Sequence, residues 1–582
     1  MKTTKAFWAI IISATIATAA LGQGQVLRRI PSDCLFCVQI NNPDEILGRL
    51  EQYLSNLQGP GLAIQAKAAI GQMISNPQLL GVRTTGQFIV FGSAPTGKID
   101  DPDSWLQSIW FMVPVTEFGQ LASNIPAEQP DANGVRQLTG TGLAIVDAGG
   151  YTLIGRPGDR LLRMAAAIRS GPSQSLAGLM DHELLEAAER SGLWAYCNVQ
   201  VLAKTIGPQI SKKIQELGTQ VASQAGPNAD QLQQICNLYA GLIDYLLGQV
   251  STVTVTARVM PDRLILTKYI RACPDGQLAQ ALAGSGQPGQ LRLLGYCQDG
   301  AMICGAWRLQ PSRLLDLSKK LIEVISAAIG QKVQQDQISK WTDLTKTLSS
   351  TMGEQMAFCI SSKPGARPFF SSRQVFEVKD PDAYLKVQRQ LIDLVYKEGL
   401  LPSLMPVQGP GLQSTQMPDA TYKDTKIQVM RITFTFKDPN AMEAQLIKQM
   451  YGDGIEFRTA VVDKLGLAVW GQDAQQAMQQ LIDQVKSGSP SQGPDEIKKA
   501  LALVEAKDVD LICTINYLRL FSAAMTALMP IPIQVQSSSN LVIAAKMDNG
   551  KAMVQLILPK SHLDEIVDTF KAMAKTTPNQ GL

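Results

Sequence analysis

The amino-acid sequence predicts an α+β fold made of two related halves, each of mainly antiparallel strands with long amphipathic helices packed on the sheet. Three observations predict it: short apolar segments with the same pattern recur along the chain, strand pairs flank turn residues, and segments of helical periodicity follow the strands. With 582 residues the chain is too long for one hydrophobic core, and its 45% hydrophobic content is enough for several domain-sized units.

The N-terminus has the pattern of a secretory signal. Lys2 and Lys5 precede an apolar run from Ala6 to Ala20, and Ala20-Leu21-Gly22 offers small residues to signal peptidase. We expect residues 1–22 to be a signal peptide; the alternative is an uncleaved anchor, although the run is shorter than the roughly 20 residues that span a bilayer. The mature chain is therefore expected to be extracytoplasmic, either periplasmic or secreted, and to contain no membrane span.

Charge and histidine content narrow the possible functions. The formal charge of +3 falls to +1 once the two lysines of the signal are removed, so no strong field attracts nucleic acid. The chain has only two histidines, His182 and His562, which leaves few ligands for a zinc site and few candidates for a histidine base.

Five cysteines share one local context, since each is third in a short apolar run. They are Cys37 in "LFCVQ", Cys197 in "AYCNV", Cys304 in "MICGA", Cys359 in "AFCIS" and Cys513 in "LICTI". This context predicts equivalent strand positions with small apolar side chains in a core. Cys34 lies three residues before Cys37, and on a strand an odd spacing puts two side chains on opposite faces. We therefore interpret this C-x-x-C pair as structural rather than as a redox or metal site.

Constant offsets between similar positions indicate an internal duplication with one insertion. The offset is 316 residues for Asp147 and Asp463, Gly155 and Gly471, and Cys197 and Cys513, and 267 or 268 residues for Cys37 and Cys304 and for Phe91 and Cys359. We predict a first half at residues 23–283, a linker at residues 284–290, a second half at residues 291–582, and within it an inserted strand-helix unit near residues 376–443.

Helix starts follow the strands in a repeated pattern. "FEVKDPDAYL" (376–385) and "FTFKDPNAME" (434–443) are near copies, and "VQINNPDEIL" (38–47) has the same order of residue types. Asn42, Asp380 and Asp438 suit the N-cap, and the proline after each suits the first helical position. We favour capping over the alternative that the acids are paired catalytic carboxylates.

Two hairpins are predicted from turn chemistry between strand-like segments. Residues 252–270 turn at Pro261-Asp262, and residues 540–558 turn at Asn549-Gly550. In each half we expect helices to cover the sheet that such strands build.

The positions of two cysteines suggest one disulfide. Cys273 opens "CPDG" and Cys297 opens "CQDG", two turn-like segments on either side of the predicted linker. Exported proteins form disulfides, so we hypothesise a Cys273–Cys297 bridge; two unpaired thiols are the alternative.

The motifs that resemble catalytic or metal sites are incomplete. Gly92, Gly97 and Lys98 have the spacing of a phosphate-binding loop, but Ile99 stands where magnesium needs Ser or Thr. His182 and Glu186 are one helical turn apart, yet no third ligand lies near them in the sequence, so a solvated helix face is the better interpretation. The sequence thus indicates no catalytic residues, no metal site and no cofactor, and it favours a protein that is not an enzyme.

Apolar residues in loop-like segments are candidates for a partner or ligand surface. The alternative is that they fold back onto the sheets as core. The candidates are Phe369, Phe370, Leu404, Met405, Met417, Leu528 and Met529.

The segment "RRIPSDCLFCVQINNPDEILGRLEQYL" (28–54), a turn into a strand and then a capped helix, resembles large exported bacterial proteins of uncharacterised function with a duplicated α+β layout. The resemblance implies that layout and transfers no catalytic residue. Our leading hypothesis is a non-enzymatic extracytoplasmic binding or structural protein of the cell envelope, with a protein or envelope partner. The alternatives are a carrier of an apolar ligand such as a lipid, and a hydrolase that uses carboxylates alone, for which Asp147 and Asp463 are candidate acids.

Overall fold

The computed structural model describes most of the chain. The described residues are 26–57, 61–73, 76–95, 101–224, 229–284, 290–328, 335–362, 368–398, 411–436, 438–452, 454–471, 473–488, 494–528 and 535–576. Several predictions fall outside them: the signal peptide at 1–22, the loop residues Gly97, Lys98 and Ile99, linker residues 285–289, and the candidate surface residues Leu404, Met405 and Met529.

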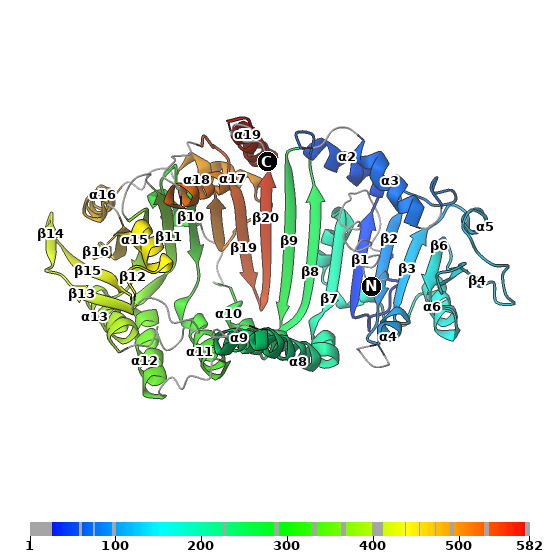
Figure 1. Cartoon of the computed structure of the whole chain (residues 1–582), viewed down its shortest axis with the longest axis horizontal. Coiled ribbons are helices and arrows are strands. Elements are labelled where there is room, and N and C mark those ends of the chain that lie inside the picture. Colours follow the sequence, from blue (N-terminus) through cyan, green and yellow to red (C-terminus); the bar gives the residue numbers. More distant parts are fainter. Residues whose placement is uncertain are drawn as a thin grey trace. The chain divides into compact units, whose positions relative to one another are not determined.

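The chain divides into two compact units. The first comprises the described residues up to Gly207 together with Val250–Arg271 and Leu558–Val567. The second comprises Pro208–Gln249, Ala272–Ile557 and the described residues from Asp568 onward. Each unit contains a sheet of antiparallel strands with helices packed against it, which confirms the predicted α+β class (Figure 1).

In the first unit the strands pair in the order β8–β7–β1–β2–β3–β6–β5–β4, and every pair is antiparallel. The strands are β1 (Phe36–Asn41), β2 (Gln87–Gly92), β3 (Ile109–Pro114), β4 (Arg136–Gln137), β5 (Ala144–Asp147), β6 (Tyr151–Gly155), β7 (Leu193–Asn198), β8 (Val250–Val259) and β9 (Arg263–Ala272). A turn at Pro261-Asp262 joins β8 to β9, and the Met260 N–H donates to the Arg263 carbonyl at 2.8 Å, as predicted for this hairpin.

The helices of the first unit cover the sheet and enclose an apolar core. They are α2 (Pro43–Tyr53), α3 (Leu62–Met73), α4 (Pro102–Leu106), α5 (Phe118–Ser123), α6 (Asp159–Ser170) and α7 (His182–Arg190), with a 3₁₀ turn η1 (Leu176–Leu179). α6 packs on β5 and β6. In the core, the rings of Phe91 and Trp110 stack with centroids 5.4 Å apart, and Trp194 is fully buried.

In the second unit the order is β20–β19–β18–β10–β11–β12–β17–β16–β15, again antiparallel throughout, and β15 also pairs with β13 and β14. The strands are β10 (Ile303–Arg308), β11 (Met352–Ser362), β12 (Phe370–Val378), β13 (Gly411–Gln416), β14 (Ala420–Tyr422), β15 (Thr425–Thr435), β16 (Ile455–Val462), β17 (Leu465–Gly471), β18 (Leu511–Ile515), β19 (Leu541–Asp548) and β20 (Lys551–Pro559). β19 and β20 turn at Asn549 and Gly550, which have φ of 48° and 75°, the left-handed values that a two-residue hairpin turn requires.

The remaining helices are mostly longer. They are α8 (Val199–Gln224), α9 (Ala229–Gln249), α10 (Gln277–Ala281), α11 (Leu315–Ala328), α12 (Gln335–Thr351), α13 (Pro381–Ile392), α15 (Met442–Tyr451), α16 (Ala474–Lys486), α17 (Asp495–Leu503), α18 (Tyr517–Leu528) and α19 (Lys560–Thr576), with short helical turns η3 (Arg292–Tyr296), η4 (Pro311–Leu314) and η5 (Asp393–Lys397). α16 packs on β16 and β17, α9 against α11, and α12 against α13. Within the described part of the chain, no helix combines the length and apolarity needed to cross a membrane.

The strands of the two units follow the same pairing scheme. β1, β2, β3, β6 and β5 have the same order of neighbours as β10, β11, β12, β17 and β16, and β7 and β8 flank β1 as β18 and β19 flank β10. Cys37 lies opposite Phe91 and Cys304 lies opposite Cys359, in agreement with the offsets of 267 and 268 residues. The 316-residue offset fits less well on β7 and β18, because Cys197 lies opposite Phe36 whereas Cys513 lies opposite Gly305, two positions further along.

Two of the three predicted helix caps are confirmed. The side chain of Asn42 accepts a hydrogen bond from the Glu45 N–H and starts α2, and that of Asp380 accepts one from the Ala383 N–H and starts α13. The prediction for Asp438 is wrong, because α15 begins only at Met442. The Asp438 carboxylate instead accepts from the Asn440 N–H at 2.9 Å and closes a turn before the helix.

The prediction that Cys34 and Cys37 point to opposite faces of a strand is also wrong. β1 begins at Phe36, so Cys34 precedes the strand, and both thiols are buried in the same apolar cluster as Trp194. Burial raises the pKa of the Cys34 thiol to about 12 and raises that of Cys37 as well. Both groups therefore stay protonated at neutral pH, which suits structural thiols.

We expect a Cys34→Ala variant to lose less stability than the wild type between pH 9 and pH 12. Burial raises the folded-state pKa of Cys34 from 9.0 to about 12. The stabilisation of the folded state by the buried, protonated thiol is therefore complete below pH 9 and is lost as the pH rises toward 12. The shift corresponds to about 4 kcal/mol of the free energy of unfolding. Urea unfolding of both proteins across this range measures it; parallel pH profiles would contradict the assignment.

Candidate functional site

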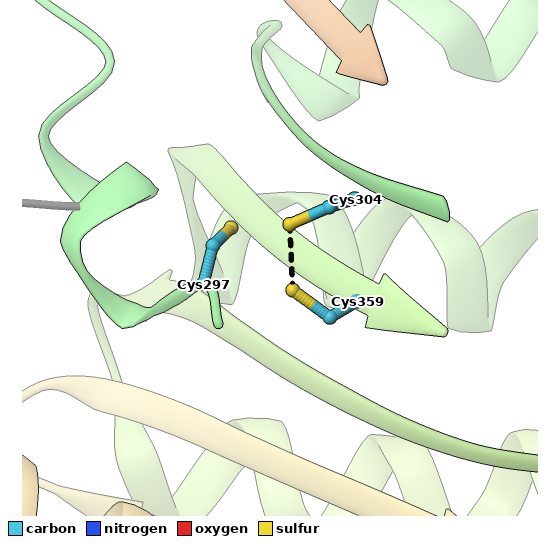
Figure 2. Close-up of side chains that lie close together, drawn as sticks. All are labelled: Cys297, Cys304 and Cys359. Carbon is cyan, nitrogen blue, oxygen red and sulfur yellow. Dashed lines mark hydrogen bonds between the residues drawn. The ribbon is translucent and has the colours of Figure 1, made fainter. Parts of the chain in front are cut away.

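Three cysteines from separate segments meet in the second unit. Cys297 follows η3, Cys304 lies on β10 and Cys359 on β11. Figure 2 shows the sulfur atoms of Cys304 and Cys359 facing each other, with the side chain of Cys297 beside them. The three sulfur atoms lie within 4.8 Å of one another and all three residues are buried. Among the described residues this is the one group of at least three Cys, His, Asp or Glu side chains close enough to share an ion.

The strand register fixes how two of these thiols face each other. Cys304 and Cys359 are directly opposite in the β10–β11 pair. The Leu309 N–H donates to the Glu354 carbonyl at 2.8 Å across the same pair of strands. Since hydrogen-bonded and non-hydrogen-bonded pairs alternate, Cys304 and Cys359 form a non-hydrogen-bonded pair, in which opposing side chains are closest. Their sulfur atoms are 2.7 Å apart.

Backbone groups hold the third thiol beside this pair. The Cys297 thiol lies 3.8 Å from the Gly305 carbonyl oxygen and 3.9 Å from that of Phe358, and it donates toward both. The Gln298 N–H donates to the sulfur of Cys359 at 3.5 Å. The contacts with the thiols of Cys297 and Cys304, in that order of effect, lower the pKa of Cys359, whereas the contacts with Cys297 and Cys359 raise the pKa of Cys304. Cys359 is therefore the member of the cluster that ionises most easily.

A second feature of the same unit is an open hollow of about 740 Å³. It lies where α15 ends and β16 begins. Its lining residues are Pro368, Arg431, Gln445, Lys448, Gln449, Tyr451, Gly452, Gly454, Glu456 and Gly471.

Two glycines shape the wall of the hollow. The chain leaves α15 at Gly452, with φ of 65°, and the Gly452 N–H donates to the Lys448 carbonyl at 2.9 Å. It enters β16 through Gly454, with φ of 151°, where a β-carbon would lie only 2.4 Å from the carbonyl oxygen of Ile432. Both positions require glycine, because an L side chain rarely adopts these angles and the second position has no room for one.

Positive charge predominates at the hollow. Arg431 and Lys448 are exposed on its wall, and Arg431 lies opposite Glu456 across β15 and β16. The Glu456 carboxylate in turn accepts from the Arg458 guanidinium at 2.7 Å. Of the charged residues that line the hollow, two are thus cations and one, Glu456, is an acid already paired with Arg458; Lys448 comes from the last turn of α15.

Of the surface residues predicted from the sequence, only Phe369, Phe370 and Met417 have side chains that the structure describes. Phe369 is only 4% exposed and packs in a core cluster with Met302 and Ala523, so the core alternative applies to it. Its ring meets that of Phe370 edge to face at 4.9 Å. Met417 is 38% exposed, just after β13. Leu528 is the last residue of α18, and its side chain lies outside the described part of the structure.

No disulfide joins any of the described cysteines, so the hypothesised Cys273–Cys297 bridge stays a prediction. Cys297 instead lies with Cys304 and Cys359, as described above. Cys273 stands in a turn, where its N–H donates to the Gln249 carbonyl at 2.8 Å and its carbonyl accepts from Gly276.

The other candidate side chains, those of His182, Glu186 and His562, lie on helices α7 and α19. His182 is the exposed first residue of α7, and Glu186 forms an ion pair with Arg190. His562 is buried on α19, with its Nδ1 atom 3.8 Å from the Glu565 carboxylate. These contacts agree with the interpretation of His182 and Glu186 as a helix face.

The two candidate acids of the hydrolase alternative are turn residues. The Asp147 carboxylate accepts from the Gly149 N–H at 3.1 Å in the β5–β6 turn. Asp463, with φ of 48°, stands in the turn between β16 and β17. Both acids thus lie in turns, and the carboxylate of Asp147 bonds within its own turn.

Comparison of the chain with protein-family models, with curated proteins and with solved structures gives no match.

Proposed function

We propose that the protein is a non-enzymatic binding or structural protein of the cell envelope, acts outside the cytoplasm, and binds an anionic group in the hollow at the end of α15. The observation that carries this proposal is the excess of positive charge at the hollow, where Arg431 and Lys448 are exposed on the wall. The Glu456 carboxylate, already paired with Arg458, offsets only part of that charge.

The size and lining of the hollow support a polar ligand. A volume of about 740 Å³ lies within the range of small-molecule sites in proteins. Glutamine, lysine, arginine, tyrosine and glutamate side chains line it, which favours a charged ligand over the apolar ligand of the carrier alternative. A guanidinium group beside an ammonium group suits a carboxylate or a phosphate, because each gives a charge-assisted hydrogen bond.

We also propose that the two halves derive from one ancestral unit and that the segment between β12 and β16, which overlaps the predicted insertion near residues 376–443 and extends beyond it, supplies the two cations of the ligand site. The common pairing scheme and the constant offsets support the first part. The second part rests on a difference in length between the two halves. Residues 115–143 separate β3 from β5, whereas residues 379–454 separate the corresponding strands β12 and β16. The longer segment contains β15 and α15, which provide Arg431 and Lys448.

We expect the full chain to bind pyrophosphate or citrate but not glucose in isothermal titration calorimetry. An Arg431→Gln/Lys448→Gln variant should bind the anions at least about tenfold more weakly, because it loses two charge-assisted contacts. Lys320→Gln, which removes an exposed charge from α11 instead, is the matched control and should bind as the wild type does. Equal affinity of the double variant and the control, or no binding of either anion, would refute the proposal.

A further inference from the structure

We propose that Cys304 and Cys359 form a cross-strand disulfide in the oxidised protein and that Cys297 is a third thiol able to take the place of either partner. The bond does not depend on ligand binding in the hollow. Cys304 and Cys359 lie in the middle of the sheet of the second unit, and Cys297 lies beside them.

The backbone already has the arrangement that such a bond requires. Non-hydrogen-bonded pairs of antiparallel strands bring the two α-carbons to about 4.5 Å, inside the range of disulfides. Cys304 and Cys359 occupy such a pair. Their sulfur atoms are in contact, 2.7 Å apart. Bond formation therefore requires only a small adjustment of the side chains.

A soft metal ion fits the same three sulfurs less well. Thiolates prefer ions such as Cu(I) and zinc. Two sulfurs at about 2.3 Å from one tetrahedral zinc ion would be about 3.8 Å apart, whereas those of Cys304 and Cys359 are 2.7 Å apart. The described geometry thus favours a covalent bond between these two over a shared ion.

The oxidation is a thiol–disulfide exchange with a disulfide-containing oxidant, either a protein or a small molecule. The Cys359 thiolate attacks one sulfur of the oxidant, which leaves a mixed disulfide and releases the first thiol. The Cys304 thiol then loses its proton, attacks the Cys359 sulfur and releases the second thiol. The two cysteines lose two electrons and two protons, and the oxidant becomes two thiols. Cys359 acts as the first nucleophile, because its thiol neighbours lower its pKa and raise that of Cys304.

Cys297 is placed to exchange with the pair. Its sulfur lies within 4.8 Å of both partners, and it contacts the carbonyls of Gly305 on β10 and Phe358 on β11. When one partner is replaced, Cys297 should form a bond with the other.

Mass mapping of the full chain, purified without reductant and with free thiols alkylated, tests the proposal. Cleavage before Asp299 separates Cys297 from Cys304, so the linkages can be told apart. We expect a Cys304–Cys359 link with Cys297 alkylated, the same link in Cys297→Ser, and a Cys297–Cys359 link in Cys304→Ser. Reduction should lower the Tm of the wild type and of Cys297→Ser by several degrees but not that of Cys297→Ser/Cys359→Ser.

Three results would overturn the proposal. The first is alkylation of both Cys304 and Cys359 in the oxidised preparation. The second is a stoichiometric soft metal whose removal by a chelator exposes all three thiols. The third is a link between Cys273 and Cys297 in place of the expected one.

Discussion

Replacing Asp510 by alanine is expected to lower the free energy of unfolding of the second unit by about 3–5 kcal/mol, because it leaves Arg308 buried without a counter-charge. The guanidinium of Arg308 donates to the Asp510 carboxylate at 2.8 Å, and the two side chains are only 8% and 5% exposed. The same carboxylate accepts from the Met547 N–H at 2.8 Å. The substitution thus removes an ion pair and leaves two donors without their acceptor. Urea unfolding followed by tryptophan fluorescence measures the loss.

The double variant Arg308→Met/Asp510→Leu separates the cost of an unpaired charge from the value of the pair. Replacing both partners by apolar residues removes the buried charge altogether, so we expect it to be more stable than Asp510→Ala. Glu398→Ala is the matched control: its exposed pair with Lys340 should contribute less than about 1 kcal/mol. A double variant less stable than Asp510→Ala would show that the pair itself, rather than the unpaired charge, provides the stability.

Features of the fold that depend on neighbouring residues could be predicted from the sequence. Asn42 and Asp380 start helices because a cap needs only a side-chain oxygen and the N–H three residues later. The same pattern failed at Asp438, where the carboxylate bonds to an N–H two residues later instead. Asparagine and aspartate form both arrangements, and the tertiary contacts of the following helix decide between them.

The thiol cluster could be predicted only in part. The apolar context of Cys304 and Cys359 placed each on a strand, but it could not show that β10 and β11 are neighbours in a register that makes the two cysteines face each other. A shift of one residue would point one of them to the opposite face. Cys297 joins them from a turn outside the sheet, so no periodicity in the sequence marks it.

The hollow and the burial of Phe369 depend on contacts far apart in the sequence. The segment "YGDGIEF" is recognisable only as a glycine-rich turn, and the hollow forms because the turn lies against β15 at Ile432. Phe369 lies in a segment that resembles an exposed loop, yet Met302 and Ala523, from distant parts of the chain, cover it.

Phe376 and Gly466 form one packing unit across β12 and β17. They are directly opposite each other in the register, and a β-carbon on Gly466 would lie 2.0 Å from the Cε2 atom of the Phe376 ring. The ring is buried against Tyr384, with centroids 5.2 Å apart. We expect Phe376→Ala to lower the free energy of unfolding by about 3–5 kcal/mol through the cavity it leaves.

Gly466→Ala should lower it by about 1–3 kcal/mol, because the added methyl group must push the ring out of its position. In the double variant the ring is absent and the methyl group occupies part of its space, so the combined loss should be smaller than the sum by at least about 1 kcal/mol. Gly48→Ala is the control: nothing lies within 4 Å of the added carbon on α2, so this change should be neutral or stabilising. Additive losses would mean that the ring relaxes freely in Gly466→Ala. The glycine would then be required by the strand backbone rather than by the ring that lies over it.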